Sequence, residues 1–280
     1  MLVKGGGPGS KQVVRQVDPV TAGIDEPSAH RQIRMCDPGA SAGKCGGVRW
    51  RCGHRKNPRA SGAGTGPALP NPGSYSRAVH MEQVRQAYAS VAELYIGLFG
   101  TPEQVHADDL AFIGRHLAGR PGTVLDLGCG PGHITGYLRS LGVDATGIDM
   151  VPEFIAHAQA AHPSGSYELG SMENLDVADH SVAGILAWGS LIHLPPQDLD
   201  GVLAEFRRVM ASAGTLVLGL FVGDEVTAFD HKVVTAYRWP VDEFSERLAR
   251  AGFTEVERLL RPGDGSHRPH AAIAAIATEG

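Results

Sequence analysis

Apolar residues are spaced in two different patterns along this chain of 280 residues. From Met81, apolar positions recur every three or four residues, which predicts a helix over 81–100. A second helix is predicted over 102–119, where Gly119 provides the stop signal. From Thr123 onward, short continuous apolar runs alternate with amphipathic segments, a pattern typical of strands that alternate with helices.

The continuous apolar runs predict buried strands of a parallel sheet, because a strand covered on both faces has no polar side. Four such runs lie at 123–128, 145–149, 181–188 and 214–221. Helical patterns between them complete an α/β, doubly wound arrangement. After a predicted helix at 241–251, two strand-like runs at 253–260 and 270–278 follow each other without a helix between them, which predicts an antiparallel edge.

Residues 1–80 differ in composition from the rest, with 14 glycines, 8 prolines and almost no apolar periodicity. Such a segment buries too little apolar surface to offset the entropy of ordering, so we predict a disordered extension. The folded domain is then expected over 81–280, with N-terminal helices at 81–119. The abrupt change at Met81 is compatible both with a misassigned start and with a natural flexible tail.

Charge and apolar content exclude several classes of protein. Residues 1–80 hold 12 Lys and Arg against 4 Asp and Glu, whereas residues 81–280 hold 13 against 26. An acidic body repels phosphate backbones, so we expect no nucleic-acid partner unless the basic segment recruits one. The sequence has no apolar run of about 18 residues and no signal-peptide core, so we expect no membrane partner and a cytoplasmic monomer or homodimer.

Cysteine usage gives no disulfide framework and no metal site. Cys36, Cys45, Cys52 and His54 do not have the spacing of a usual zinc site, and the body has no clustered metal ligands. We therefore predict no metal. Cys129 has no basic residue beside it in sequence, which favours a structural role over a reactive one.

The most informative segment is VLDLGCGPGHITGYL, residues 124–138. A predicted strand ends here in Asp126, alternate glycines follow, and then a helix begins. Glycine lets the backbone approach a bound molecule closely in a tight turn, and a nucleotide-type ligand is expected at the carboxyl ends of parallel strands. The dinucleotide fingerprint G-x-G-x-x-G is not met, because His133 occupies the place of its last glycine.

The D-x-G-x-G-x-G pattern, followed by Asp149 at the end of the next strand, resembles the class I S-adenosylmethionine-dependent methyltransferases, in particular their small-molecule members. The resemblance covers about 88–277. It implies a Rossmann-like methyltransferase fold with a mostly parallel, seven-stranded sheet, helices on both faces and an antiparallel edge. It also implies S-adenosyl-L-methionine as the cofactor.

By this resemblance, the glycine turn binds the methionine part of the cofactor through Gly128, Cys129, Gly130 and Gly132. Asp126 is expected near the amino group of the cofactor. Asp149 is expected to accept hydrogen bonds from both ribose hydroxyls, which suits a carboxylate at a strand end. The alternative for Asp149 is a cap for the helix that follows it.

Two later segments complete the resemblance. In GSMENLDVADHSVAGILAW, Ser171 and Met172 occupy the positions that grip adenine, with Met150 packing beside them. Serine is a weaker acceptor than the aspartate usual in the family, and Met172 as core filler is the alternative. In AWGSLIHLPP, Trp188 and Gly189 are expected to line the methionine end of the cofactor.

His193 is in the same segment, at a position whose side chain often faces the transferred methyl group in members of the family. A neutral imidazole, with an ordinary pKa of about 6.5, can take a proton from a hydroxyl or amine nucleophile. We therefore name His193 as the candidate catalytic base. The alternative is a structural loop residue that hydrogen-bonds backbone.

The acceptor pocket is expected between the first predicted helix and the segment 221–240. Tyr88 and Tyr95 on the helix, and Tyr237 and Trp239 on the segment, are the candidate substrate-binding residues, because aromatic rings stack on flat or apolar acceptors. Packing is the alternative for each of them. On the following helix, Arg207 and Arg208 are expected to be solvated charges.

The sequence therefore predicts an enzyme that transfers a methyl group from S-adenosylmethionine to an oxygen, nitrogen or carbon atom of a small molecule. In-line placement of nucleophile and methyl group supplies most of the acceleration in such a reaction, so few catalytic residues are needed. Two alternatives stay open. One is a catalytically silent S-adenosylmethionine-binding protein, because fold alone does not fix function. The other is an NAD-dependent oxidoreductase, which His133 disfavours.

Overall fold

The computed structural model describes residues 72–264 and 267–278. Most of the predicted N-terminal extension, with Cys36, Cys45, Cys52 and His54, lies outside the described residues. The first helix begins at Pro72, nine residues before the expected boundary at Met81. Arg77 and His80, on this earlier part of the helix, contact Glu173 and the backbone of His193 respectively.

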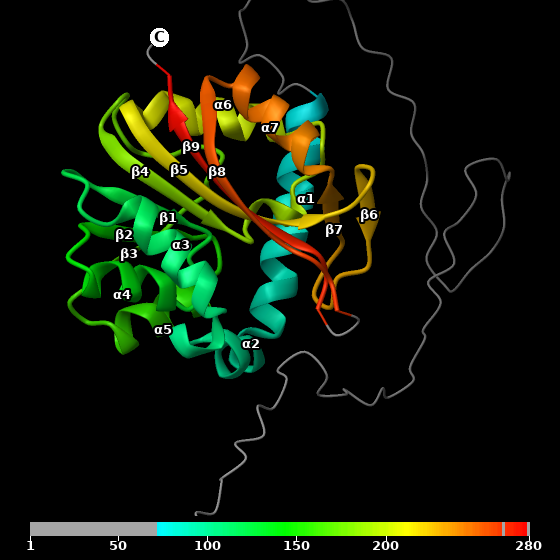
Figure 1. Cartoon of the computed structure of the whole chain (residues 1–280). Helices are drawn as coiled ribbons and strands as arrows, with labels where there is room; N and C mark the ends of the chain where they lie inside the picture. The colour runs from blue at the N-terminus through cyan, green and yellow to red at the C-terminus, as the bar shows by residue number, and fades with distance from the viewer. Residues whose placement is uncertain (1–71, 265–266, 279–280) are drawn as a thin grey trace, which may run out of the picture.

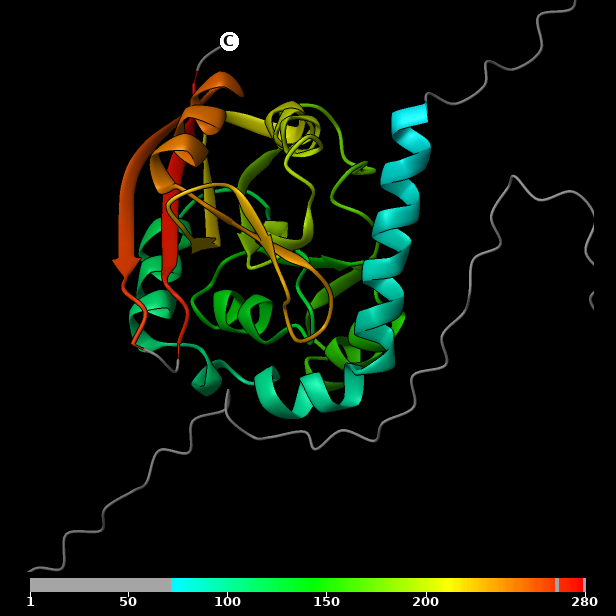
Figure 2. The ribbon, with the colours of Figure 1, turned by 90° about the vertical axis from the view of Figure 1, so that its right-hand side faces the viewer.

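The N-terminal helices stand beside and beneath the sheet. Helix α1 spans Pro72–Ser90, α2 spans Ala92–Phe99, the short 3₁₀ turn η1 spans Pro102–Gln104, and α3 spans Ala107–Leu117. Figure 2 shows α1 as an upright helix along one side of the molecule, with α2 turning beneath it. The described residues contain no helix that is both long and apolar enough to cross a bilayer.

Five parallel strands form the main part of the sheet (Figure 1). They are β1 (Val124–Leu127), β2 (Ala145–Asp149), β3 (Ser166–Leu169), β4 (Val182–Trp188) and β5 (Met210–Val222), in the spatial order β3-β2-β1-β4-β5. The connecting helices are α4 (His133–Ser140), α5 (Pro152–Ala161) and α6 (Leu199–Val209), with the 3₁₀ turn η2 (Leu191–His193) before α6. The strands after β1 are added on one side of it up to β3, and β4 and β5 are added on its other side. A ligand site is expected at this switch point, at the carboxyl ends of β1 and β4.

The predicted antiparallel edge is confirmed. Strand β9 (His270–Ala277) pairs antiparallel with β5, and β8 (Phe253–Arg261) pairs antiparallel with β9. Helix α7 (Val241–Arg250) precedes β8, and Gly252 follows it with a φ of 84°. Glycine has no Cβ to clash in this left-handed conformation, so it makes the sharp return from helix to strand.

The predicted count of seven strands is wrong, because the sheet has nine strands in the described part of the chain. The two additional strands are β6 (Thr227–Phe229) and β7 (Ala236–Trp239), which form an antiparallel hairpin within the segment 221–240. Strand β7 runs parallel to the last residues of β5, with Phe221 opposite Arg238. Strands of three and four residues are too short to give a readable apolar alternation.

Side chains of the central strands alternate between two apolar layers. Leu125 and Leu127 face the layer that α6 and α7 cover, whereas Val124 packs into the layer of α3 and α4. In β4, Ile185 and Leu186 divide in the same way between the two layers. The continuous apolar runs therefore belong to strands buried on both faces, as predicted.

Candidate functional site

Ten of the predicted site residues line one cavity at the carboxyl ends of β1, β2 and β4. They are Tyr88, Tyr95, Gly128, Gly130, Asp149, Met150, Met172, Trp188, Gly189 and His193. The first two come from α1 and α2, and the others come from the ends of strands β2 and β4 and from the segments that follow the strands. Segments separated by more than 100 residues in sequence therefore meet at one place.

The glycine turn after β1 brings bare backbone to the wall of this cavity. The amide N–H of Gly128 donates to the carbonyl of Ile148 at 2.7 Å, which holds the turn against the end of β2. Gly128 has a φ of 74°, and a Cβ placed there would overlap the Cβ of Ser190. Only glycine fits at this position without displacing the loop after β4.

Asp149 fixes the turn from the other side. Its carboxylate accepts the amide N–H of Gly130 at 2.9 Å and that of Val151 at 2.8 Å. Burial raises the pKa of Asp149, while these backbone donors act against the rise. Each carboxylate oxygen accepts one bond and has a second acceptor site, so the group can also receive two hydroxyl hydrogens. The bond to Val151 also supports the start of α5, so the predicted binding role and the helix-capping role do not exclude each other.

Asp126 lies deeper than the resemblance implies. Its side chain is buried at the end of β1 and accepts a hydrogen bond from the hydroxyl of Thr135 on α4 at 2.6 Å. It is not among the residues that line the cavity. Burial raises its pKa to about 7, and the Thr135 hydroxyl opposes that rise.

Three other predicted cofactor-binding residues also lie behind the cavity wall. Cys129 packs with Ile155 and Tyr167, and burial raises the pKa of its thiol well above the ordinary value, which agrees with a structural role. Gly132, the residue before α4, has a φ of 83°, and its carbonyl accepts a hydrogen bond from the hydroxyl of Tyr167 at 3.2 Å. The Ser171 hydroxyl accepts the amide N–H of Glu173 at 3.2 Å, so that side chain folds back on its own loop.

His193 lies in η2 and lines the same cavity as Asp149, and both of its ring nitrogens have partners. Nδ1 lies 2.8 Å from the carbonyl oxygen of Thr235, and Nε2 lies 2.8 Å from the hydroxyl of Tyr88. A carbonyl oxygen only accepts, so Nδ1 carries the hydrogen and Nε2 accepts from Tyr88. Burial lowers the pKa of His193 to about 4.

Aromatic rings surround this histidine. The His231 ring is 5.2 Å from that of His193, and the Tyr88 ring packs edge-on against Tyr95 at 5.5 Å and Phe154 at 6.1 Å. Sequence reasoning missed His231 and Phe154, because neither belongs to a recognisable motif. It also missed Ser190, whose buried hydroxyl has no hydrogen-bond partner within the described structure.

Trp239 is not a cavity residue, which corrects the prediction that it stacks on substrate. It is 3% exposed and packs edge-on against Phe244 at 5.4 Å, under the guanidinium of Arg247. Residues alternate across a strand, and position 239 of β7 falls on the core side. Tyr237 also packs against the core and does not line the cavity.

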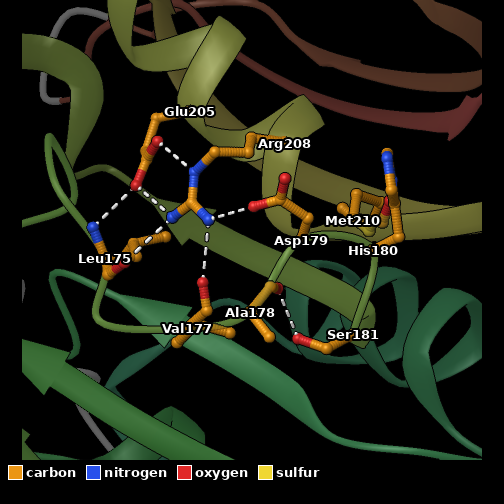
Figure 3. A network of polar contacts seen from close by, with 9 residues as sticks. All are labelled: Leu175, Val177, Ala178, Asp179, His180, Ser181, Glu205, Arg208 and Met210. Atoms are coloured by element: carbon orange, nitrogen blue, oxygen red, sulfur yellow. Dashed lines mark hydrogen bonds and ion pairs between the residues drawn. The ribbon is translucent and has the colours of Figure 1, made fainter.

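Arg208, whose side chain is 34% exposed, is also the centre of a polar network, shown in Figure 3. Its guanidinium donates to the carboxylate of Glu205, to the carboxylate of Asp179 and to the carbonyls of Leu175 and Val177. Glu205 in turn accepts the amide N–H of Leu175 at 2.7 Å. The network fastens the loop after β3 to α6, and the first residues of that loop, Gly170 and Met172, line the cavity.

Helices α1 and α2 cover the cavity. Met81, Val84, Tyr88 and Tyr95 from these helices line it, and its volume is about 90 Å³. Pockets for small molecules usually measure ~300–1,000 Å³. The cavity is therefore smaller than a usual small-molecule pocket, and α1 and α2 contribute four of the residues that line it.

A glycine turn, a strand-end carboxylate and a covering helix pair at the carboxyl edge of a parallel sheet define a nucleotide-type binding protein. Residues 124–214, which include the turn and Asp149, match the methyltransferase-domain family. This match agrees with the resemblance of the sequence motifs to the class I S-adenosylmethionine-dependent methyltransferases, and it spans residues 124–214 of the 280-residue chain.

Individual relatives agree with this placement. The chain is 29% identical over 164 residues to a malonyl-[acyl-carrier protein] O-methyltransferase of Erwinia billingiae, covering 59% of this chain and 61% of that protein. It is 25% identical over 203 residues to a ubiquinone biosynthesis O-methyltransferase of Xanthomonas campestris pv. campestris, covering 70% and 81% of the two chains. The chain therefore spans less than two thirds of the length of the Erwinia relative.

A solved structure shares the fold. The 1,6-didemethyltoxoflavin-N1-methyltransferase of Burkholderia thailandensis, solved with 1,6-didemethyltoxoflavin and S-adenosylhomocysteine, superposes with a TM-score of 0.59 at 23% identity. The match covers 77% of this chain and 94% of that chain. The Rossmann-like methyltransferase architecture is thus the same in both.

Proposed function

We propose that this chain transfers a methyl group from S-adenosylmethionine to a small-molecule acceptor. The observation that carries the proposal is Asp149, a buried carboxylate with spare acceptor sites beside a bare glycine turn. A ribose diol satisfies both of those sites, and beside Gly128 lies the Ser190 hydroxyl, which has no hydrogen-bond partner among the described residues. The residues present therefore fit the cofactor.

We assign the following roles to the chain's own residues. Gly128 and Gly130 offer backbone to the methionine part, Asp149 holds the sugar, and Met172 and Met150 pack on the base. When bound, S-adenosylmethionine supplies an electrophilic methyl group on a sulfonium whose sulfur leaves with the bonding electrons. His193 is placed to receive the proton of the acceptor. Trp188 and the covering helices exclude water from the site.

The names of the relatives support a small-molecule acceptor methylated on oxygen or nitrogen. Two relatives are named O-methyltransferases and the structural neighbour is named an N1-methyltransferase. A cavity lined by Tyr88, Tyr95 and Trp188 suits an acceptor with apolar or aromatic surface.

Isothermal titration calorimetry of the full chain with S-adenosylhomocysteine tests the cofactor assignment. We expect binding by the native protein and a loss of at least ~1.5 kcal/mol, or more than about tenfold in Kd, for Asp149→Ala. Asp144→Ala is the matched control, because Asp144 lies at the other end of the same strand and is exposed. Equal affinities for the two variants would remove Asp149 from the site.

Mass spectrometry of a panel of acceptors incubated with S-adenosylmethionine then tests turnover. Methylated product is the expected result. Binding of S-adenosylhomocysteine with no product from any acceptor would favour a silent cofactor-binding protein, and binding of NADH in its place would favour an oxidoreductase.

A further inference from the structure

Two arginines converge on one aromatic ring of the β6–β7 hairpin. The guanidinium carbon of Arg238 lies 4.8 Å from the centre of the Phe229 ring, and that of Arg268 lies 4.6 Å from it. Arg238 and Phe229 belong to the hairpin, whereas Arg268 comes from the turn between β8 and β9. The negative face of an aromatic ring attracts a cation, so the ring holds two positive charges from separate parts of the chain close together.

Neither guanidinium has a carboxylate partner. Within the described residues, Arg238 and Arg268 form no ion pair and no hydrogen bond, although Asp224, Glu225 and Asp230 lie in the segments next to β6. Carboxylates are plentiful, because residues 81–280 hold 26 Asp and Glu against 13 Lys and Arg. Ion pairs with a carboxylate are formed by Arg77, Arg85, Arg115, Arg208, Arg247, Arg258 and Arg261. The pair on Phe229 therefore keeps its N–H donors for another ligand.

A row of aromatic rings connects this pair to the cavity. The centre of the His231 ring lies 6.3 Å from that of Phe229 and 5.2 Å from that of His193, which lines the cavity. Burial lowers the pKa of His231, and the positive charges of Arg268 and Lys232 lower it further. The positive potential of this region thus acts at the ring next to His193.

We propose that Arg238 and Arg268 form a binding site for an oxyanion, a carboxylate or phosphate group of the acceptor, outside the cavity where methyl transfer takes place. The inference rests on the proposed function and narrows its acceptor to an anionic molecule. A guanidinium presents several N–H donors in one plane and suits carboxylate and phosphate oxygens. A bound anion also offsets the repulsion between the two like charges. The rings of His231 and Phe229 favour a flat body between the anionic group and the methylated atom.

The two arginines differ in how firmly they are held. Arg238 is half-buried, and its side chain packs over Gly223, where an added Cβ would lie 3.1 Å from it. Arg268 is exposed. A donor that is already positioned loses less conformational entropy when a ligand binds, so we expect Arg238 to contribute more to the affinity than Arg268.

Three probes with the same flat body test the proposal: 2-naphthoate, 2-naphthyl phosphate and the neutral 2-naphthamide. Ligand-observed NMR titrations of the full chain at neutral pH compare them with and without saturating S-adenosylhomocysteine. This thioether has no sulfonium charge, so a preference for an anion comes from the protein. We expect at least one anion to bind at least about tenfold more tightly than the amide, the scale of one hydrogen bond to a charged group. The tighter anion identifies the group as carboxylate or phosphate.

The same titrations keep this inference apart from the proposed function. Failure of the chain to bind S-adenosylhomocysteine in calorimetry counts against the proposed function. Equal binding of the amide and both anions, with and without S-adenosylhomocysteine, counts against the oxyanion site. Added salt should weaken a genuine preference, because it screens charges that are accessible to solvent.

Substitutions locate the site. We expect Arg238→Gln and Arg268→Gln each to reduce the preference, with the larger loss in Arg238→Gln, and Arg238→Lys to keep part of it. The lysine retains the positive charge, so it separates loss of charge from loss of packing. Arg250→Gln is the matched control, because Arg250 is exposed, pairs with no described residue and lies at the end of α7 away from β7. An unchanged preference in both Gln variants of the pair, or an equal loss in Arg250→Gln, would overturn the proposal.

Discussion

Replacement of Asp126 by asparagine should stabilise the fold at neutral and alkaline pH. The carboxyl group is 2% exposed and receives one hydroxyl donor, from Thr135 at 2.6 Å. Its ionised form is therefore poorly solvated, and burial raises its pKa from 3.8 to about 7. Asparagine has nearly the same shape and keeps an oxygen that accepts the Thr135 hydrogen, but it never ionises.

The sign and size of the effect follow from proton linkage. Between pH 3.8 and about 7 the folded chain keeps this proton while the unfolded chain releases it. The contribution of Asp126 to stability is thus fully present below pH 3.8 and is lost as the pH rises to about 7. The loss amounts to about 1.4 kcal/mol per pH unit and to roughly 4 kcal/mol at most.

Urea denaturation followed by tryptophan fluorescence, from pH 4.5 to 8.5, measures the effect. The free energy of unfolding of the native protein minus that of Asp126→Asn should fall with pH up to about 7 and then stay constant. Burial also lowers the pKa of His133 and His193 to about 4, which makes stability rise with pH, but both proteins share this contribution. Asp144→Asn, at an exposed position, should give a flat difference. A difference that is flat or rises for Asp126→Asn would refute the reasoning.

Two further substitutions test how the cavity is built. Gly128→Ala should lower both stability, by about 2 kcal/mol, and affinity for S-adenosylhomocysteine, because its Cβ overlaps Ser190 at a φ of 74°. Gly142→Ala, at a φ of 82° but with open space around it, should keep the affinity in calorimetry, and equal losses would contradict the steric argument. Arg208→Gln should lower Tm by about 4–8 °C and weaken S-adenosylhomocysteine binding, since the carbonyls of the loop after β3 lose their donor. Arg207→Gln, which loses one bond to the Thr278 carbonyl, should change Tm much less in a thermal melt, and similar shifts would contradict the role of Arg208.

The parallel core of the fold was readable from sequence for a physical reason. Strands buried on both faces need apolar side chains at every position, so β1, β2, β4 and β5 stand out as continuous runs. The hairpin of β6 and β7 was not readable, because its short strands pair with the end of β5 and owe their conformation to that tertiary contact.

In the candidate site, too, some features could be predicted from the sequence and others could not. The glycine turn and Asp149 are adjacent to strand ends, so their meeting at one edge follows from the topology. The depth of Asp126 and the core position of Trp239 depend on which way a side chain points, and the motif letters do not encode that direction. The partners of His193 come from positions 88 and 235, and only the folded chain brings these residues together.

The hold of Thr235 on His193 has an evolutionary consequence. Since a main-chain carbonyl grips the imidazole, almost any side chain can stand at position 235 without releasing the ring. The hairpin of β6 and β7 is then free to vary in sequence at its edge, while the ring of His193 keeps its orientation through a hydrogen bond that no side-chain substitution at position 235 removes.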